Sequence, residues 1–302
     1  MSELRPSARA LHAAMFSLLG AAALCAGRVH AQGNTEIFLV QLRETGNRLA
    51  AGTVTRITNR PGYDNQPHIL PDNAAVLYTA ADAAGQADIF RFDIGRSTSS
   101  SLTRSAPESE YSATLMPSGD RFSVIRVERD SAQRLWSFQL DGTDARVVLR
   151  DVRPVGYHAW VDANRVALFV LGSPSTLQLA DVRTGVARVI ARNIGRSLQR
   201  VPGRTAISFV HREGESPGWI KAFDANAGTL SPIVPSFAEN EYHAWTPSGT
   251  LVSARGSMLY EFKPGRDSDW VLFANLSAHG ITGISRLAVS PDGSLLAIVV
   301  NL

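Results

Sequence analysis

The chain has 302 residues, of which 44% are hydrophobic and 19% charged, and its formal net charge at neutral pH is +3. This is enough apolar material for a sizeable core in one domain, and the composition is not that of a disordered or fibrous chain. The arginines are scattered and do not form basic runs with interleaved aromatic residues, so we expect no nucleic-acid partner. A single cysteine excludes a disulfide framework within the chain.

The first 31 residues have the organisation of a secretory signal peptide. Arg5 and Arg9 give a positively charged start, Ala13–Ala26 is an apolar core of signal-peptide length, and Val29–Ala31 has the small residues of a cleavage site. We therefore predict cleavage after Ala31 and a location in the periplasm or outside the cell.

Two alternatives concern the same segment. The apolar stretch could remain as an uncleaved anchor, although it is short and rich in alanine for a membrane span. Cys25 could carry a lipid, but Leu24 precedes it, where such sites need a small residue, so lipidation is not expected. Cleavage after Ala31 removes Cys25 and leaves one domain, 32–302, with a formal charge of +1 and no expected membrane span.

After the leader, no segment has a helical period, and the residues predict short strands. Thr35–Leu42 alternates apolar and polar residues, which is typical of a half-buried strand, and Gly52–Thr58 fits an outer strand beside it.

Six copies of one pattern follow, each a hydrophobic strand that runs into a tight turn. The copies are His68-Ile-Leu-Pro-Asp-Asn73, Thr114-Leu-Met-Pro-Ser-Gly119, Ala159-Trp-Val-Asp-Ala-Asn164, Gln199-Arg-Val-Pro-Gly-Arg204, Ala244-Trp-Thr-Pro-Ser-Gly249 and Ala288-Val-Ser-Pro-Asp-Gly293. Their turn residues Pro71, Pro117, Asp162, Pro202, Pro247 and Pro291 are 46, 45, 40, 45 and 44 residues apart. Proline presets the backbone for such a turn, and glycine or asparagine accepts the positive φ that it requires.

The same order of strands follows each turn. A second, apolar strand is predicted at Ala74–Thr79, Arg121–Val127, Arg165–Leu171, Thr205–His211, Leu251–Ala254 and Leu295–Val300. A third, alternating strand is predicted at Asp88–Asp93, Leu135–Leu140, Leu177–Asp181, Trp219–Phe223 and Met258–Phe262. An outer strand then completes the unit, as at Ala145–Leu149, Ala187–Ala191 and Asp269–Phe273.

A repeat of this length built from four short strands predicts a β-propeller with one four-stranded blade per repeat. The sixth repeat has only its first two strands before Leu302, and Thr35–Leu42 with Gly52–Thr58 would supply the other two. We therefore expect an all-β, six-bladed propeller closed by a blade that the N- and C-terminal strands share, which removes an open sheet edge. An open stack of sheets or another blade count is the alternative.

These repeats resemble the TolB-type, WD40-like propeller repeat of bacteria, whose blades read Pro-x-Trp-Ser-Pro-Asp-Gly, then an apolar strand, then Asp-Ile-Tyr-x-x-Asp and Leu-Thr. The matching segments are Pro67-His-Ile-Leu-Pro-Asp-Asn73, His243-Ala-Trp-Thr-Pro-Ser-Gly249, Leu287-Ala-Val-Ser-Pro-Asp-Gly293, Asp88-Ile-Phe-Arg-Phe-Asp93 and Leu102-Thr103. The resemblance covers 32–302 and implies the fold. It implies no single function, because the same propeller serves in translocation, peptidase and lyase proteins.

Two departures from relatives of this type limit what the resemblance implies. TolB has an α/β domain before its propeller, whereas here the repeats begin shortly after the leader, so the role of TolB in the Tol–Pal system is not transferred. Relatives of prolyl oligopeptidase add an α/β-hydrolase domain with a Gly-x-Ser-x-Gly elbow, and this sequence has no such motif. We expect no serine peptidase activity.

Propellers bind ligands mostly at the mouth of the central channel, where the innermost strands converge. Five residues before each turn residue stand Gln66, Ser112, Tyr157, Ser197, Tyr242 and Arg286, and six residues before stand Asn65, Tyr111, Gly156, Arg196, Glu241 and Ser285. Polar and aromatic types dominate. We predict a binding rim for a peptide, sugar or polar small molecule, made of Asn65, Gln66, Tyr111, Ser112, Tyr157, Arg196, Ser197, Glu241, Tyr242 and Arg286. A water-lined channel without a ligand is the alternative.

Three histidines allow a second hypothesis. His158 and His243 stand four residues before their turn residues, and His68 three before, so that with Gln66 they could form a metal site in the channel. The resemblance includes pectate-fragment lyases that bind a metal through His and Gln. The alternative is packing between blades, because His158 and His243 share a strand face with Trp160 and Trp245, and His68 has the opposite parity. This alternative is preferred, so no cofactor is expected.

Carboxylates near the start of the innermost strands could support acid–base chemistry at one mouth, although no spacing singles out a pair. They are Asp64, Glu108, Glu110, Glu239 and Glu241. The preferred hypothesis is therefore an exported, non-enzymatic and monomeric propeller that binds a protein or peptide partner in the cell envelope. The alternative is a metal-dependent carbohydrate-active lyase or hydrolase with its site in the channel.

Overall fold

Short β-strands, numbered β1 to β24, make up almost all regular structure of the described residues, which are 33–214 and 217–302 of a computed structural model. Two 3₁₀ turns, η1 (Pro71–Asn73) and η2 (Ser277–His279), are the only helical elements among them. The described residues belong to one compact unit, Ala31–Leu302. The predicted signal peptide with its cleavage site and Cys25 lie outside the described residues. In the part described, no helix is long and apolar enough to cross a membrane.

Four sheets contain four antiparallel strands each, in chain order from the innermost to the outermost strand. The first comprises β7 (Ser109–Leu115), β8 (Arg121–Val127), β9 (Gln133–Gln139) and β10 (Arg146–Leu149). The second comprises β11 (Val155–Trp160), β12 (Arg165–Val170), β13 (Thr176–Asp181) and β14 (Ala187–Arg192). The third comprises β15 (Ile194–Arg200), β16 (Ala206–His211), β17 (Trp219–Asp224) and β18 (Leu230–Pro235). The fourth comprises β19 (His243–Trp245), β20 (Leu251–Arg255), β21 (Met258–Phe262) and β22 (Val271–Asn275).

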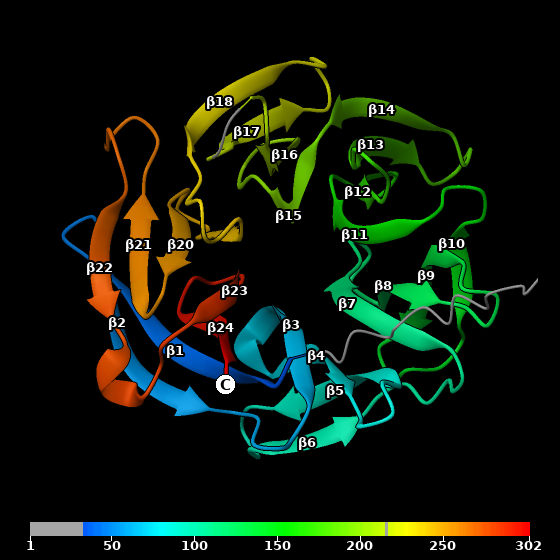
Figure 1. The fold of residues 1–302 in the computed structure, drawn as a ribbon, viewed down its shortest axis with the longest axis horizontal. Coiled ribbons are helices and arrows are strands. Elements are labelled where there is room, and N and C mark those ends of the chain that lie inside the picture. The colour runs from blue at the N-terminus through cyan, green and yellow to red at the C-terminus, as the bar shows by residue number, and fades with distance from the viewer. Residues whose placement is uncertain (1–32, 215–216) are drawn as a thin grey trace, which may run out of the picture. The chain divides into compact units, whose positions relative to one another are not determined.

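The remaining strands form an eight-stranded sheet that joins both ends of the unit. One half comprises β3 (Tyr63–Ile69), β4 (Ala75–Ala81), β5 (Ala87–Asp93) and β6 (Thr98–Ser101). The other comprises β23 (Ile284–Val289), β24 (Leu295–Asn301), β1 (Thr35–Thr45) and β2 (Arg48–Arg56). A single parallel pair, Thr35 with Tyr63, connects the halves. Figure 1 shows the sheets placed around a common centre, with β3, β7, β11, β15 and β23 nearest to it.

The predicted second and third strands of the repeats are confirmed to within two residues at each end. The turns have the expected hairpin geometry. At Ser290, just before the turn residue Pro291, the backbone N–H donates to Leu295 O across the hairpin, and the carbonyl oxygen accepts from the N–H of Gly293. Gly293 has φ +78°, and a Cβ there would lie 2.9 Å from Pro247 of the neighbouring sheet. Glycine is needed here both for the turn and for the close approach of two sheets. The outer strand predicted at Gly52–Thr58 begins earlier, at Arg48.

The core lies between neighbouring sheets. The second strand of each unit is the most buried, and all seven residues of β4 are buried. Leu77 and Ile89 of one sheet pack with Phe122 and Val124 of the next in a single apolar cluster. Because each sheet covers the face of its neighbour, the apolar strands are buried on both sides, which explains their near-continuous hydrophobic sequences.

Buried carboxylates hold the connections that lead into the innermost strands. Glu110 at the start of β7 is fully buried and accepts hydrogen bonds from Ser105 (2.5 Å) and Thr103 (3.1 Å), with Arg126 at 3.3 Å. Burial raises the pKa of Glu110 from 4.5 to about 7, against the effect of Ser105 and Arg126. The carboxyl group of Glu110 therefore holds the connection between β6 and β7 against the start of β7.

Glu110 should give the fold a measurable pH dependence. A carboxyl whose pKa is raised on folding contributes stability that is present below its unfolded pKa of 4.5 and is lost as the pH rises to about 7. Glu110→Gln does not titrate, so the free energy of unfolding of the wild type should fall relative to the variant across this window, by at most about 1.4 kcal/mol per pKa unit. Urea unfolding at several pH values measures the difference. Glu108→Gln, in the same loop, is the control, and a difference that rises or stays flat would contradict the assignment.

Candidate functional site

Irregular pairing marks the innermost strands at one end. The register shifts between Asn65 and His68 in β3, between Tyr111 and Thr114 in β7, and at comparable places in β11, β15 and β23. Gln66 and Ser112 have positive φ values of 56° and 57°. A bulge adds a residue to one strand, so it offsets the alternation of side chains and re-aims them. Strict alternation is therefore a poor guide to which residues face the centre.

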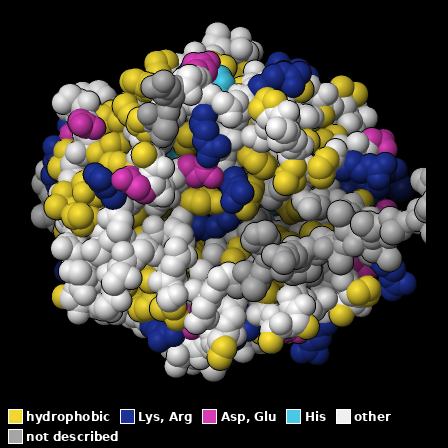
Figure 2. All heavy atoms as spheres, viewed as in Figure 1, with side chains coloured by type: hydrophobic (Ala, Val, Ile, Leu, Met, Phe, Trp, Pro, Cys, Tyr) yellow, Lys and Arg dark blue, Asp and Glu magenta, His cyan; other side chains and the backbone are white. Residues whose placement is uncertain are grey.

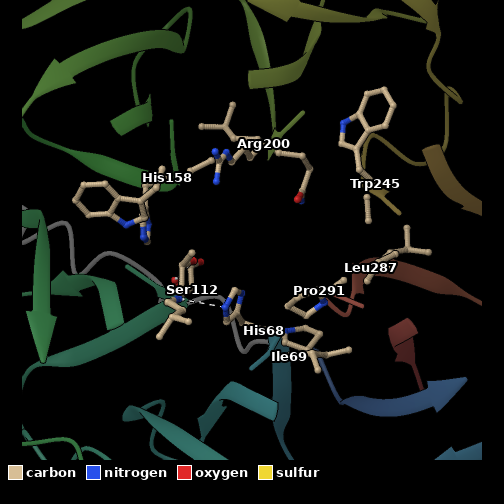
Figure 3. A pocket seen from close by; sticks show the side chains of 18 of the residues that line it. His68, Ile69, Ser112, His158, Arg200, Trp245, Leu287 and Pro291 are labelled. Atoms are coloured by element: carbon tan, nitrogen blue, oxygen red, sulfur yellow. Dashed lines mark hydrogen bonds between the residues drawn. The ribbon is translucent and has the colours of Figure 1, made fainter. Parts of the chain in front are cut away.

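A cavity of about 790 Å³ lies at the centre and is lined by all six innermost strands. The positions five residues before the turn all line it: Gln66, Ser112, Tyr157, Ser197, Tyr242 and Arg286. The positions two before the turn line it as well: Ile69, Leu115, Trp160, Arg200, Trp245 and Val289. The cavity thus extends from the predicted rim to the turn residues. Figure 3 shows His68, His158 and Arg200 reaching into it from different strands.

Of the predicted rim residues six before the turn, only Arg196 lines the cavity. Asn65 is buried, and its side-chain oxygen accepts a hydrogen bond from the backbone N–H of Gln66 (2.8 Å). Glu241 pairs with Arg212 and the backbone N–H of Arg196. Tyr111 lies outside the lining and packs against the cluster around Ile125 and Leu135.

Some side chains of the cavity lining already make hydrogen bonds within the protein. Gln66 Oε1 accepts hydrogen bonds from Thr79 Oγ1 and from the backbone N–H of Ser112, both at 2.8 Å, and so joins two neighbouring blades. Ser197 is buried and bonds to the backbone of His243 on the next sheet. These two side chains hold the wall in place, and the freer groups are arginines and tyrosines.

Arg286 lies at the centre of a group that we call the arginine–tyrosine cluster: Arg286, Tyr63, Tyr157 and Tyr242. Its Nη2 donates a hydrogen bond to Tyr157 Oη (2.8 Å), and its Cζ lies 5.1 Å and 4.2 Å from the ring centroids of Tyr157 and Tyr242. The guanidinium therefore joins β23 and β11 to Tyr242, the residue that precedes β19. Cation–π contacts of this kind contribute about 0.5–2 kcal/mol each.

The titration of this cluster is shifted in a consistent way. Burial raises the pKa of Tyr63 to about 12 and also raises that of Tyr242, whereas Arg286 outweighs burial at Tyr157 and lowers its pKa. Burial opposes the charge on Arg286, yet the neighbouring phenols raise its pKa. Arg286 is thus a permanent cation surrounded by neutral oxygens.

The lining as a whole is cationic. It contains Arg196, Arg200 and Arg286 and no aspartate or glutamate. Among the ion pairs of the described residues, none involves these three arginines. On the face seen in Figure 2, side chains of both signs are scattered, and Lys and Arg also lie near its middle. The positive charge of the cavity is therefore local, in a chain whose charges nearly balance.

The predicted packing role of His158 and His243 corresponds to a repeated clamp between sheets. Ser208 Oγ on β16 lies 2.8 Å from His243 Nε2 and accepts from Trp245 Nε1 at 2.9 Å. Ser123 on β8 makes the equivalent contacts with His158 (2.7 Å) and Trp160 (2.9 Å). Burial lowers the pKa of His158 to about 3 and of His243 to about 4. Both rings are therefore neutral.

The predicted metal ligands are not brought together. His68 faces the cavity despite its parity, because the bulge in β3 precedes it, but its Nε2 accepts a hydrogen bond from the backbone N–H of Leu115 (3.1 Å). His158 also lines the cavity, whereas His243 does not. Among the described residues, no three His, Cys, Asp or Glu side chains form a group that could hold a metal ion.

The candidate carboxylates do not form a catalytic pair at the cavity, since none of Asp64, Glu108, Glu110, Glu239 and Glu241 lines it. Burial raises the pKa of Asp64 to about 6, a value that suits acid–base work. However, Asp64 is fully buried and bonds to Arg60 (2.9 Å), so it fastens a loop as Glu110 does.

Sequence reasoning missed Arg200, Tyr63 and the two clamp serines. A signal for the serines is present: Ser123 and Ser208 each stand 35 residues before the histidine that they contact, in the middle of an apolar strand. Arg200 interrupts a position that is apolar in the other repeats, which marks it as exceptional.

Comparison with protein families finds no family that matches the sequence, and comparison with curated proteins finds no match either. Solved structures do match. A protein of Agrobacterium tumefaciens assigned as TolB has a TM-score of 0.66 at 13% identity, over 90% of this chain and 99% of its own. TolB from Acinetobacter baumannii has a TM-score of 0.57 at 13% identity, over 89% of this chain and 64% of its own. This chain therefore spans slightly less than two thirds of that protein.

An oligogalacturonate lyase in complex with manganese has a TM-score of 0.54 at 15% identity, over 82% of this chain and 80% of its own. Identities this low establish the fold alone. The fold is that of the TolB-type propellers, which confirms the resemblance read from the repeats.

The clamp predicts a specific loss of stability. Ser208→Ala removes the hydroxyl that hydrogen-bonds to both His243 and Trp245 and leaves buried polar groups without a partner, which should cost about 1–3 kcal/mol in the free energy of unfolding. Urea unfolding gives the value. Ser100→Ala, at an exposed position of β6, is the control, and equal effects of the two substitutions would contradict the clamp.

Proposed function

We propose that this chain is an exported, six-bladed β-propeller that binds a protein or peptide partner of the cell envelope in its central channel and catalyses no reaction. The arginine–tyrosine cluster carries this proposal. A permanent cation and two aromatic rings, those of Tyr157 and Tyr242, meet in the wall of the cavity, which is the kind of anchor that dominates binding interfaces.

The contacts at the two ends of the unit support six blades and a closed ring. Strand β1 pairs with β24 over seven residues, from Thr35 opposite Asn301 to Gln41 opposite Leu295. Innermost strand β23 contacts both β19 and β3. On the outside, the buried carboxylate of Glu261 accepts from Arg48 and from the backbone N–H of Leu49, which ties β2 to β21. The sixth blade would thus be β23, β24, β1 and β2.

A cross-link tests the closure. Gln41 and Leu295 are directly opposite in the ladder, at a Cα separation of about 5 Å that a disulfide can span. In 32–302, which has no other cysteine, the double variant Gln41→Cys, Leu295→Cys should oxidise quantitatively and raise the free energy of unfolding by about 2–4 kcal/mol. Each single variant is a control. Thiols that stay free under mild oxidation would overturn the closed ring.

The chemistry of the cavity favours binding over catalysis. Its lining holds no carboxylate for acid–base work, and the histidine nitrogen of His68 that could bind a metal already accepts a backbone hydrogen bond. A cationic wall also opposes a divalent ion. The manganese-bound lyase shares the fold, but within 33–214 and 217–302 of this chain no three His, Cys, Asp or Glu side chains form a group that could hold a metal ion.

Export is the remaining part of the proposal. Residues 1–31 have the pattern of a signal peptide, so we propose a mature protein that is monomeric and lies in the periplasm or outside the cell. The TolB-type fold is compatible with this location.

Photo-cross-linking from the cavity tests the function. The full-length chain is expressed in an envelope-bearing host with benzoylphenylalanine in place of Tyr242, which lines the cavity, or of Val186, an exposed residue of an outer turn. Illumination should give a discrete protein adduct from position 242 and not from position 186, and the mature chain should begin at residue 32. Adducts from neither position, or equally from both, would refute channel binding. An N-terminus at residue 1 would refute cleavage after Ala31.

A further inference from the structure

We propose that the ligand of the cavity is an acidic peptide segment in an extended conformation, whose carboxylates meet Arg286 at one level and Arg200 at another. This inference rests on the proposed function, since it names the class of ligand for the same site. It follows from the position of three arginines along a cavity that contains no negative charge.

The arginines lie at two levels of the wall. Arg286 is five residues before its turn residue and Arg200 two before, so they are offset along the strands by three residues, or about 10 Å. Arg196, on the same strand as Arg200, belongs near the level of Arg286. Two carboxylates three residues apart in an extended peptide are separated by the same distance. The cavity therefore matches acidic side chains spread along a chain better than one small anion.

The guanidinium groups are available to a ligand. Arg196 and Arg200 are exposed, and neither side chain takes part in an ion pair or hydrogen bond within the described residues. Of the five N–H groups of Arg286, one bonds to Tyr157 Oη. An arginine that lacks a carboxylate partner in a partly enclosed site gains most from an anionic ligand, because bidentate pairing with a carboxylate is among the strongest hydrogen-bonding arrangements.

The wall at the level of Arg200 favours a peptide over a sugar. Ile69, Leu115 and Val289 line it there, each two residues before its turn residue as Arg200 is, and prolines of the turns line the end beyond it. Such a surface packs well against apolar side chains but offers few partners for the hydroxyl groups of a saccharide. The neutral histidines of the lining add no charge. A segment in which two apolar residues separate two acidic ones fits both the charges and the wall.

Calorimetric titration of the mature protein with synthetic peptides tests the inference. The probes are the capped hexapeptide Glu-Leu-Leu-Glu-Leu-Leu, whose two carboxylates are three residues apart, and its counterpart with glutamine in place of glutamate, which differs from it only in charge. The acidic peptide should bind at least about tenfold more tightly, with an affinity that falls as NaCl is added. Arg200→Gln should remove most of this difference, because Arg200 is exposed and its loss should not disturb folding, which thermal melting checks.

Arg150→Gln is the matched control, because it makes the same change of charge at an exposed position after β10, outside the cavity. It should leave both affinities unchanged. Arg286→Lys keeps the positive charge but loses the planar pairing of a guanidinium with a carboxylate. If Arg200 is the dominant contact, Arg286→Lys should weaken binding of the acidic peptide by a smaller factor than Arg200→Gln does.

The outcomes separate the inference from the function on which it rests. Equal binding of the two peptides, or an acidic-peptide affinity that Arg150→Gln lowers as much as Arg200→Gln, overturns charge recognition in the cavity and leaves peptide binding intact. Binding of neither peptide overturns the acidic-peptide inference, whereas adducts at position 242 would still support the proposed function. Binding of trigalacturonate without the acidic peptide would show that the arginines serve a uronate, which refutes a peptide ligand.

Discussion

The contact between neighbouring sheets is the interaction on which the rest of the structure depends. No sheet of the unit can bury its apolar second strand alone, so each needs the face of the next one, as Leu77 and Phe122 show. Polar contacts then fix how the faces meet: Gln66 joins β3 to β7, and the serine–histidine–tryptophan clamp joins sheets farther along the chain. The cavity is a consequence of this packing, because its wall consists of the strands that the contacts hold in place.

The fold could be predicted from the sequence because its signals are local and repeated. Turns such as Ser290-Pro-Asp-Gly293 recur at a nearly constant interval, and the apolar period of the following strands is the signature of buried sheet. The boundaries of the outer strands were less certain, and β2 begins four residues before its predicted start. Outer strands are mostly exposed, so their residues carry little of the hydrophobic pattern from which strands are recognised.

The site was predictable in part. Position within the repeat identified Arg286, Tyr157 and Tyr242, since equivalent positions of a repeat face the same environment. It misjudged Asn65 and Glu241, whose side chains bond to the backbone or to Arg212 instead of facing the cavity. Alternation also fails beside the register shift in β3, where the consecutive residues His68 and Ile69 both line the cavity, and such bulges have no reliable sequence signal when the residue is Gln or Ser.

The clamp also makes the order of the repeats part of the molecule's identity. A blade that carries His-Ala-Trp requires a serine on the second strand of the blade before it, and only two junctions of the described unit have this pair. Duplicating, deleting or exchanging one repeat would set a tryptophan and a histidine against an apolar neighbour, with ring nitrogens of both left without a hydrogen-bond partner. Although the repeats look alike, they are not interchangeable, and this array should tolerate point changes in its loops far better than recombination between its blades.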